Sequence, residues 1–115
     1  MAYKAIHRFA RISPREVRPL ADLVRGKYAD EALDILRYQP HRGARMIEGV
    51  IRSALGNAQD ADQNPGQTIN VDSLFVKEVK IDGGPMFKRI RPRSRGMAYP
   101  ILKRSSHITV TLEEV

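Results

Sequence analysis

The chain has 115 residues, with 20 Lys and Arg against 13 Asp and Glu, and a formal net charge of +7 at pH 7. It contains no cysteine, which excludes disulfides, thiolate metal sites and cysteine-based catalysis. No apolar run approaches the roughly 20 residues of a membrane-spanning helix, and the first residues lack the apolar segment of a secretory signal, so we expect one cytoplasmic domain over residues 1–115.

The N-terminal part predicts a strand and then a helix. Residues 3–12 mix apolar and basic side chains, as in a strand. Ser13-Pro14-Arg15-Glu16 is a helix-start signal, with Ser as N-cap, Pro at the first helical position and Glu placed to close a capping box. Gly26 ends this helix, and Pro19 inside it predicts a kink or a late start.

Two more helices and two strands follow. Apolar residues at helical spacing predict helices over about 29–37 and 41–61, and a turn cluster occupies 62–66. Residues 74–81 and 106–112 then have the Val, Ile and Phe content and alternation of strands.

Positive charge is concentrated between these last two strands. Residues 1–82 hold 13 Lys and Arg against 11 Asp and Glu, whereas residues 83–112 hold seven Lys and Arg and no acid. A structureless loop of about two dozen residues is unusual in a compact domain. We therefore expect both strands to continue as arms of one hairpin over about 83–100, turning between Lys88 and Gly96, with a globular body over 1–82 and 101–115.

The hairpin composition favours binding to nucleic acid. Arg forms bidentate bonds to phosphate, and Phe87, Ile90 and Tyr99 interleave with the cations and offer surfaces for unstacked bases. The alternative is a disordered basic segment or a solvated charged face, which the internal position and the flanking strands disfavour. A second group, Lys4, Arg8, Arg11, Arg15 and Arg18, either shares one surface or consists of ordinary surface charges.

Catalysis has little support. His7, His41 and His107 are far apart and show no metal-ligand spacing such as His-Glu-x-x-His, and no phosphate loop is present. We expect no enzyme, no metal and no cofactor. Two rivals to an RNA-binding structural protein stay open: a free architectural module that inserts a basic ribbon into a nucleic-acid groove, and an RNA-processing enzyme that uses His107.

Several segments resemble one family, the bacterial form of the L-twenty-two family of large-subunit ribosomal proteins. The matching segments are residues 17–27, 31–36 and 53–58, then the more specific Lys88-Arg89-Ile90-Arg91-Pro92-Arg93, Gly96 and residues 101–110. Met97, Gly56 and Tyr99-Pro100 depart from the family pattern and put individual contacts in question.

The resemblance implies an α+β fold of three helices packed on a three-stranded antiparallel sheet, with a long protruding basic β-hairpin. It implies binding to several domains of 23S-type rRNA, contacts with neighbouring ribosomal proteins, a role in subunit assembly, and a hairpin that lines the polypeptide exit tunnel beside the nascent chain. The expected rRNA-binding residues are Lys88, Arg89, Arg91, Arg93, Arg95, Lys103, Arg104, His107, Arg8, Arg11, Arg15 and Arg18, and the expected tunnel-lining tip is Phe87, Lys88, Arg89 and Ile90.

Overall fold

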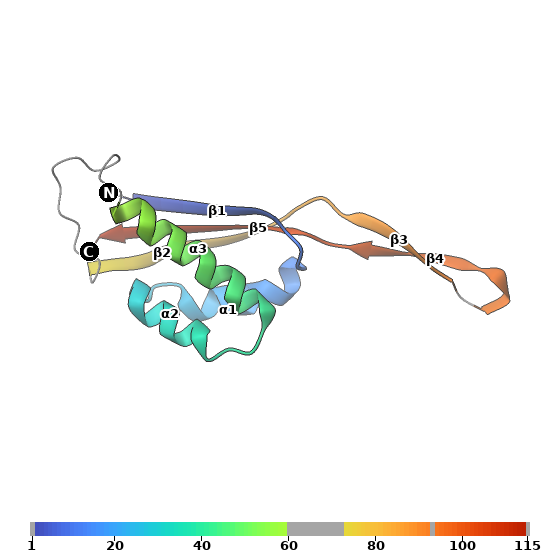
Figure 1. Ribbon diagram of the computed structural model, residues 1–115, viewed down its shortest axis with the longest axis horizontal. Coiled ribbons are helices and arrows are strands. Elements are labelled where there is room, and N and C mark those ends of the chain that lie inside the picture. The colour runs from blue at the N-terminus through green and yellow to red at the C-terminus, as the bar shows by residue number, and fades with distance from the viewer. Residues whose placement is uncertain (1, 60–72, 93, 115) are drawn as a thin grey trace.

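The computed structural model describes residues 2–59, 73–92 and 94–114 of the chain. Three helices and five strands occur in these ranges, which confirms the predicted α+β fold (Figure 1). The predicted turn at 62–66 lies outside the described residues. In chain order the elements are β1 (Ala2–Ala10), α1 (Pro14–Val24), α2 (Ala29–Arg37), α3 (Arg42–Gln59), β2 (Leu74–Gly83), β3 (Phe87–Pro92), the short 3-10 turn η2 (Ser94–Gly96), β4 (Ala98–Lys103) and β5 (Ser106–Glu114).

The body is a three-stranded antiparallel sheet with helices on one face. The strand order is β1-β5-β2, so the last strand lies between the first strand and the strand that precedes the hairpin. Alternate side chains such as Ile108, Val110 and Leu112 are fully buried, while Lys4 and Lys80 of the neighbouring strands are exposed. Helix α3 contacts β1 and β5, α1 contacts β2, and α2 packs against α3 (Figure 1). Apart from Tyr3, the buried residues of the core are aliphatic.

Helix α1 begins where the sequence predicts, with one difference. Ser13 is the N-cap and Pro14 is the first helical residue, so the alternative of a late start is wrong. The Ser13 side chain makes no capping hydrogen bond, and the backbone N–H of Glu16 instead donates to the Ser13 carbonyl over 3.1 Å. The predicted capping box is therefore absent. Pro19 is accommodated inside the helix, on its exposed side.

The segment between α1 and α2 covers the outer edge of β2. Gly26, at a φ of +80°, donates its N–H to the Val76 carbonyl over 2.9 Å, and the Val76 N–H donates to the Lys27 carbonyl over 2.8 Å. The Arg25 guanidinium donates to the Val79 carbonyl over 2.6 Å. These bonds satisfy backbone groups that an edge strand otherwise presents to a second chain.

The hairpin projects beyond the body. Strands β3 and β4 form a separate two-stranded antiparallel sheet, which extends the molecule to 68 Å along its longest axis (Figure 1). The radius of gyration is 17.5 Å, whereas a compact domain of this length has one of about 13 Å. Every described β3 and β4 residue is exposed except Ile101, which is half-buried. Among the described helices, none has the length and hydropathy to cross a bilayer.

Candidate nucleic-acid interface

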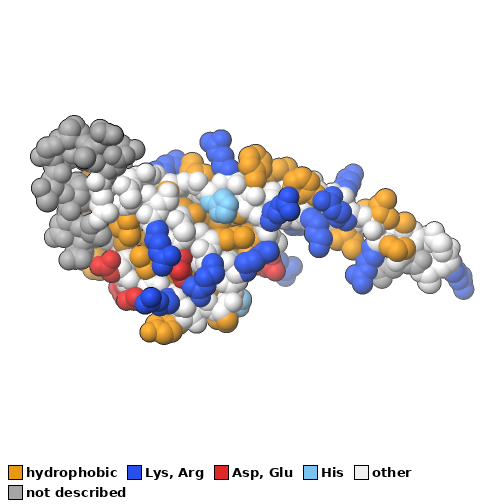
Figure 2. All heavy atoms as spheres, viewed as in Figure 1, with side chains coloured by type: hydrophobic (Ala, Val, Ile, Leu, Met, Phe, Trp, Pro, Cys, Tyr) orange, Lys and Arg blue, Asp and Glu red, His pale blue; other side chains and the backbone are white. Residues whose placement is uncertain are grey.

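The hairpin carries most of the predicted RNA-binding cations. Lys88, Arg89 and Arg91 lie on β3, Arg95 lies in the turn, and Lys103 ends β4. Arg104 follows directly, and Arg93 lies outside the described residues. Blue side chains recur along the whole arm in Figure 2, whereas the acidic side chains visible on that face gather on the body. The ion pairs among the described residues all lie on the body, so no acid neutralises the described hairpin cations.

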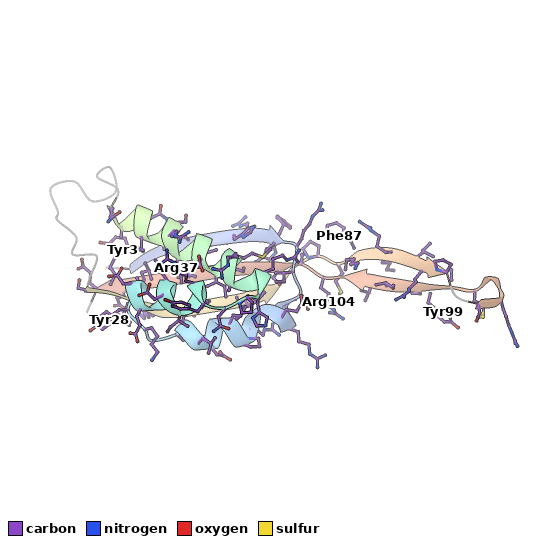
Figure 3. All side chains as sticks on the ribbon, turned by 60° about the horizontal axis from the view of Figure 1, so that its bottom comes forward. Tyr3, Tyr28, Arg37, Phe87, Tyr99 and Arg104 are labelled. Atoms are coloured by element: carbon purple, nitrogen blue, oxygen red, sulfur yellow. The ribbon has the colours of Figure 1, made fainter. Side chains whose placement is uncertain are left out.

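The register of the arms corrects the predicted tip. Phe87 is opposite Lys103 and Pro92 is opposite Ala98, so the chain reverses between Pro92 and Ala98. Phe87 therefore lies where the hairpin leaves the body, far from Tyr99, which is on β4 close to the turn, as Figure 3 shows. The prediction that residues 87–90 form the tip is wrong, because they are the first four residues of the outgoing arm. The turn itself lies inside the interval predicted from Lys88 to Gly96.

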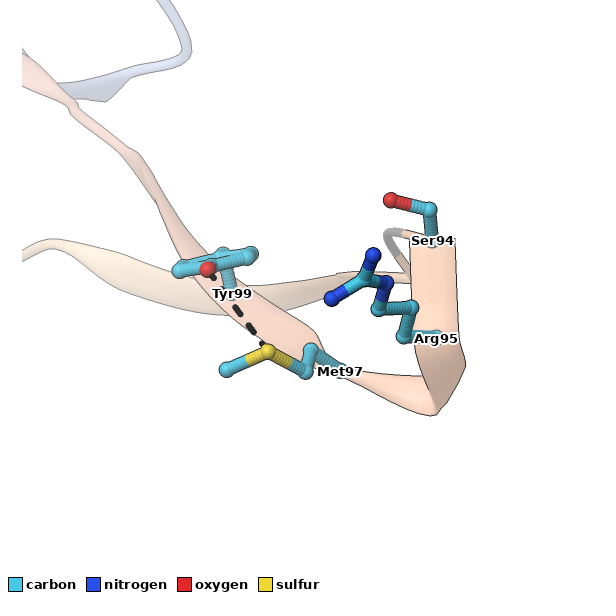
Figure 4. Close-up of a pocket in the computed structure, with 4 residues that line it drawn as sticks. All are labelled: Ser94, Arg95, Met97 and Tyr99. Carbon is cyan, nitrogen blue, oxygen red and sulfur yellow. Dashed lines mark hydrogen bonds between the residues drawn. The ribbon is translucent and has the colours of Figure 1, made fainter.

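The turn contains a shallow hollow lined by four side chains. Arg95 and Gly96 both have positive φ, 66° and 71°, and so reverse the chain. Ser94, Arg95, Met97 and Tyr99 line the hollow, with the Arg95 guanidinium directed back toward Tyr99 (Figure 4). The Tyr99 hydroxyl lies 4.0 Å from the Met97 sulfur. Met97 thus supplies a soft apolar wall beside an aromatic ring.

A set of contacts holds the junction between body and hairpin. The Phe9 N–H donates to Nδ1 of His107 over 3.0 Å, and the two rings meet edge to face at 4.9 Å. Phe9 adopts a φ of 58°, at a bulge in β1. Across the junction, the Ser105 hydroxyl donates to the Pro85 carbonyl over 2.7 Å and the Gly84 N–H donates to the Ser105 carbonyl over 2.9 Å. His107, which the sequence predicts to make RNA or structural contacts, thus makes structural contacts with Phe9, and its role in RNA binding stays a prediction.

The second group of cations is divided by the fold. Lys4 and Arg8 lie on β1 at one edge of the sheet, whereas the Arg18 guanidinium donates to the Ile81 carbonyl of β2, 3.2 Å away, at the other edge. The five cations thus do not form one patch. Arg15 lines a hollow between the starts of α1 and α3, beside His41 and Arg42, and Arg42 donates to the Arg11 carbonyl.

The described residues hold no group of three or more His, Cys, Asp or Glu arranged to bind a metal ion. The molecule thus consists of a long basic arm joined to a small body by a hydrogen-bonded junction.

Comparison with known proteins identifies the family. The sequence profile described as "Ribosomal protein L22p/L17e" matches residues 5–113. The chain belongs to the ribosomal protein L22p/L17e family.

Three relatives illustrate how much of an L22p/L17e protein the chain covers, and all three are named "Large ribosomal subunit protein uL22". The relative from Rhodopirellula baltica is 61% identical over 98% of this chain and 95% of its own. The one from Caldicellulosiruptor saccharolyticus is 50% identical over 93% and 84%, and the one from Maridesulfovibrio salexigens is 50% identical over all of both chains. These proteins are named as ribosomal proteins and not as enzymes, so the family confirms the prediction of a non-catalytic protein.

Proposed function

We propose that the chain is a structural component of the large ribosomal subunit in the cytoplasm, where it binds 23S-type rRNA, aids subunit assembly and lines the polypeptide exit tunnel with its hairpin. The observation that carries this proposal is a projecting arm between β2 and β5, residues 84–105, with seven Lys and Arg and no acid. The relatives are named as proteins of the large ribosomal subunit, and we infer from these names that this chain belongs to the same particle.

The proposed action is positional. The Lys and Arg side chains of the arm repel one another in solvent, and phosphate oxygens offset that repulsion through charge-assisted hydrogen bonds. The arm leaves the body through β2 and β5, which pair with each other over most of their length in the body sheet. Cations on the arm would hold rRNA segments together, and no bond in a substrate is made or broken. Neighbouring ribosomal proteins and the nascent chain complete the proposed set of partners.

Binding across a salt series tests the RNA interaction. We expect a large-subunit rRNA fragment to be retained in a filter assay with a log–log salt slope of roughly −4 to −6, since six or seven phosphate contacts contribute about 0.7–0.9 each. Deleting residues 86–97 removes five of the seven cations and should reduce the slope to roughly −1.5. Circular dichroism of the deletion variant is the control, and an unfolded body would show that the arm belongs to the core.

The assay also separates the proposal from its main rival. A free architectural module would bind duplex DNA at least as well as the rRNA fragment across the salt series. Equal retention of rRNA by the deletion variant would refute the role of the hairpin.

The tunnel role has its own test. In assembled subunits, a photoreactive side chain at position 95, in the turn, should cross-link to a nascent chain, and one at the exposed body position Lys77 should not. Cross-links from position 77 alone would place the body, and not the hairpin, beside the nascent chain.

A further inference from the structure

The hairpin ladder sorts side chains onto two faces of different chemistry. Directly opposed residues of an antiparallel pair point to the same side, and successive residues alternate. The register therefore places Phe87, Arg89, Arg91, Tyr99, Ile101 and Lys103 on one face, called here the cationic face, and Lys88, Ile90, Pro92, Ala98, Pro100 and Leu102 on the other, called the apolar face. Two-stranded ribbons twist strongly, so both faces wind around the arm, and the arms cross in Figure 1.

The two faces differ in what they can bind. The cationic face holds three of the four ladder cations and both aromatic rings, and the Arg89 guanidinium lies 5.9 Å from the centre of the Phe87 ring. The apolar face holds Lys88 as its one cation, and its Ile90 side chain is 77% exposed. A phosphate pressed against the remaining residues of that face, which are all apolar, would lose water without gaining a side-chain donor, which is unfavourable.

The cationic face continues into the turn. Tyr99, which with Arg91 forms the pair of this face nearest the turn, also lines the hollow with Arg95 and Met97 (Figure 4). Aromatic rings and guanidinium planes are the groups on which unstacked bases lie, and the hollow brings both together beside a thioether. This face thus offers phosphate partners along its length and a platform for a base at its end.

We propose that the cationic face is the RNA-binding surface of the hairpin, that its ligand is an unpaired RNA segment with exposed bases, and that the apolar face makes no phosphate contact. This inference rests on the proposed function and refines it. An unpaired segment fits better than a duplex because Phe87 and Tyr99, 46% exposed each, stack only on bases that are not already stacked in a helix. Cations on the same face then reach the phosphates of that segment.

Two lysines provide a matched test. Lys88 and Lys103 lie at adjacent rungs near the base of the hairpin, but on opposite faces. Each substitution by Gln removes one charge from the same end of the arm. Lys103→Gln should lower the magnitude of the salt slope by about 0.7–0.9, and Lys88→Gln should leave the slope close to the wild-type value. The probe is an unstructured oligouridylate, and the large-subunit rRNA fragment is measured in parallel.

Tyr99 and Ile90 test the base contact in the same way. Tyr99→Leu should weaken oligouridylate binding about tenfold, the loss of one stacked base. Tyr99→Phe, which keeps the ring, should restore it. Ile90→Thr, on the apolar face, should change affinity less than twofold. The wild-type protein should bind the oligouridylate more tightly than an RNA duplex of the same length.

Equal slope losses for Lys88→Gln and Lys103→Gln would overturn the assignment of faces, and so would equal losses for Tyr99→Leu and Ile90→Thr. Preference for the duplex would overturn the choice of ligand. In each of these outcomes the wild-type protein still binds the rRNA fragment, and the proposed function stands. If the wild-type protein ignores that fragment at low salt, the proposed function itself fails.

Discussion

Two adjacent glycines at the base of the hairpin differ sharply in the space around them. A Cβ built on Gly84 would lie 2.5 Å from the Ser105 Oγ and 3.3 Å from Nε2 of His107, whereas a Cβ on Gly83 would have no atom within 4 Å. Neither glycine has a positive φ, so backbone strain does not distinguish them. We predict that Gly84→Ala destabilises the body and that Gly83→Ala does not.

The magnitude follows from the contacts that must change. Ser105 is 2% exposed, and its hydroxyl must rotate away from the new methyl group and lose the 2.7 Å bond to the Pro85 carbonyl, at a cost of about 1 kcal/mol. The His107 ring, held by the Phe9 N–H, must also shift. Together these changes give about 1–3 kcal/mol, the usual cost of overpacking by one methylene.

The assay is thermal or urea unfolding followed by circular dichroism. A loss of about 2 kcal/mol corresponds to a fall in Tm of roughly 5–10 °C for a domain of this size. Both substitutions reduce the entropy of the unfolded chain by a similar amount, so the difference between Gly84→Ala and Gly83→Ala isolates the steric contribution.

A double variant identifies the cause. Ser105→Ala removes the hydroxyl that the new methyl group would meet, so adding it to Gly84→Ala should recover about 1 kcal/mol relative to the sum of the single changes. The reasoning would be refuted if Gly84→Ala were no more destabilising than Gly83→Ala. Strict additivity in the double variant would instead place the conflict away from Ser105.

Two further pairs of substitutions in α3 test packing and charge. Gly56→Ala adds a Cβ with no atom within 4 Å and should raise the free energy of unfolding by about 0.5–1 kcal/mol. Gly43→Ala adds a Cβ that would meet Leu20 at 3.0 Å and should lower the free energy of unfolding. Equal effects of the two substitutions in urea unfolding would contradict this. Arg45→Ala should cost about 1–2 kcal/mol, because Arg45 pairs with the buried Glu48 and also donates to the Arg37 carbonyl over 3.0 Å. Arg52, 3.6 Å from the same carboxylate and 65% exposed, is the control, and its replacement by Ala should cost less than about 0.5 kcal/mol.

Local pattern carried most of the fold prediction. The helix predicted over 29–37 has those same bounds, and the apolar alternation of residues 106–112 lies within β5. These features depend on spacing along the chain, which the sequence displays directly. The concentration of cations between residues 83 and 112 is likewise a property of the sequence alone, and so is the resemblance that the family profile later confirmed.

The tertiary structure decided what depends on register and on distant partners. Alternation along β3 is the same for any turn position, so only the cross-strand pairing, from Phe87 with Lys103 to Pro92 with Ala98, shows where the hairpin turns. The role of Arg18 depends on the Ile81 carbonyl 63 residues away, and that of His107 on the Phe9 N–H 98 residues away. The two faces of the hairpin arise from cross-strand register for the same reason. The sequence by itself therefore determined which segments form helices and strands and where the charge lies, and the folded chain decided which side chains share a surface.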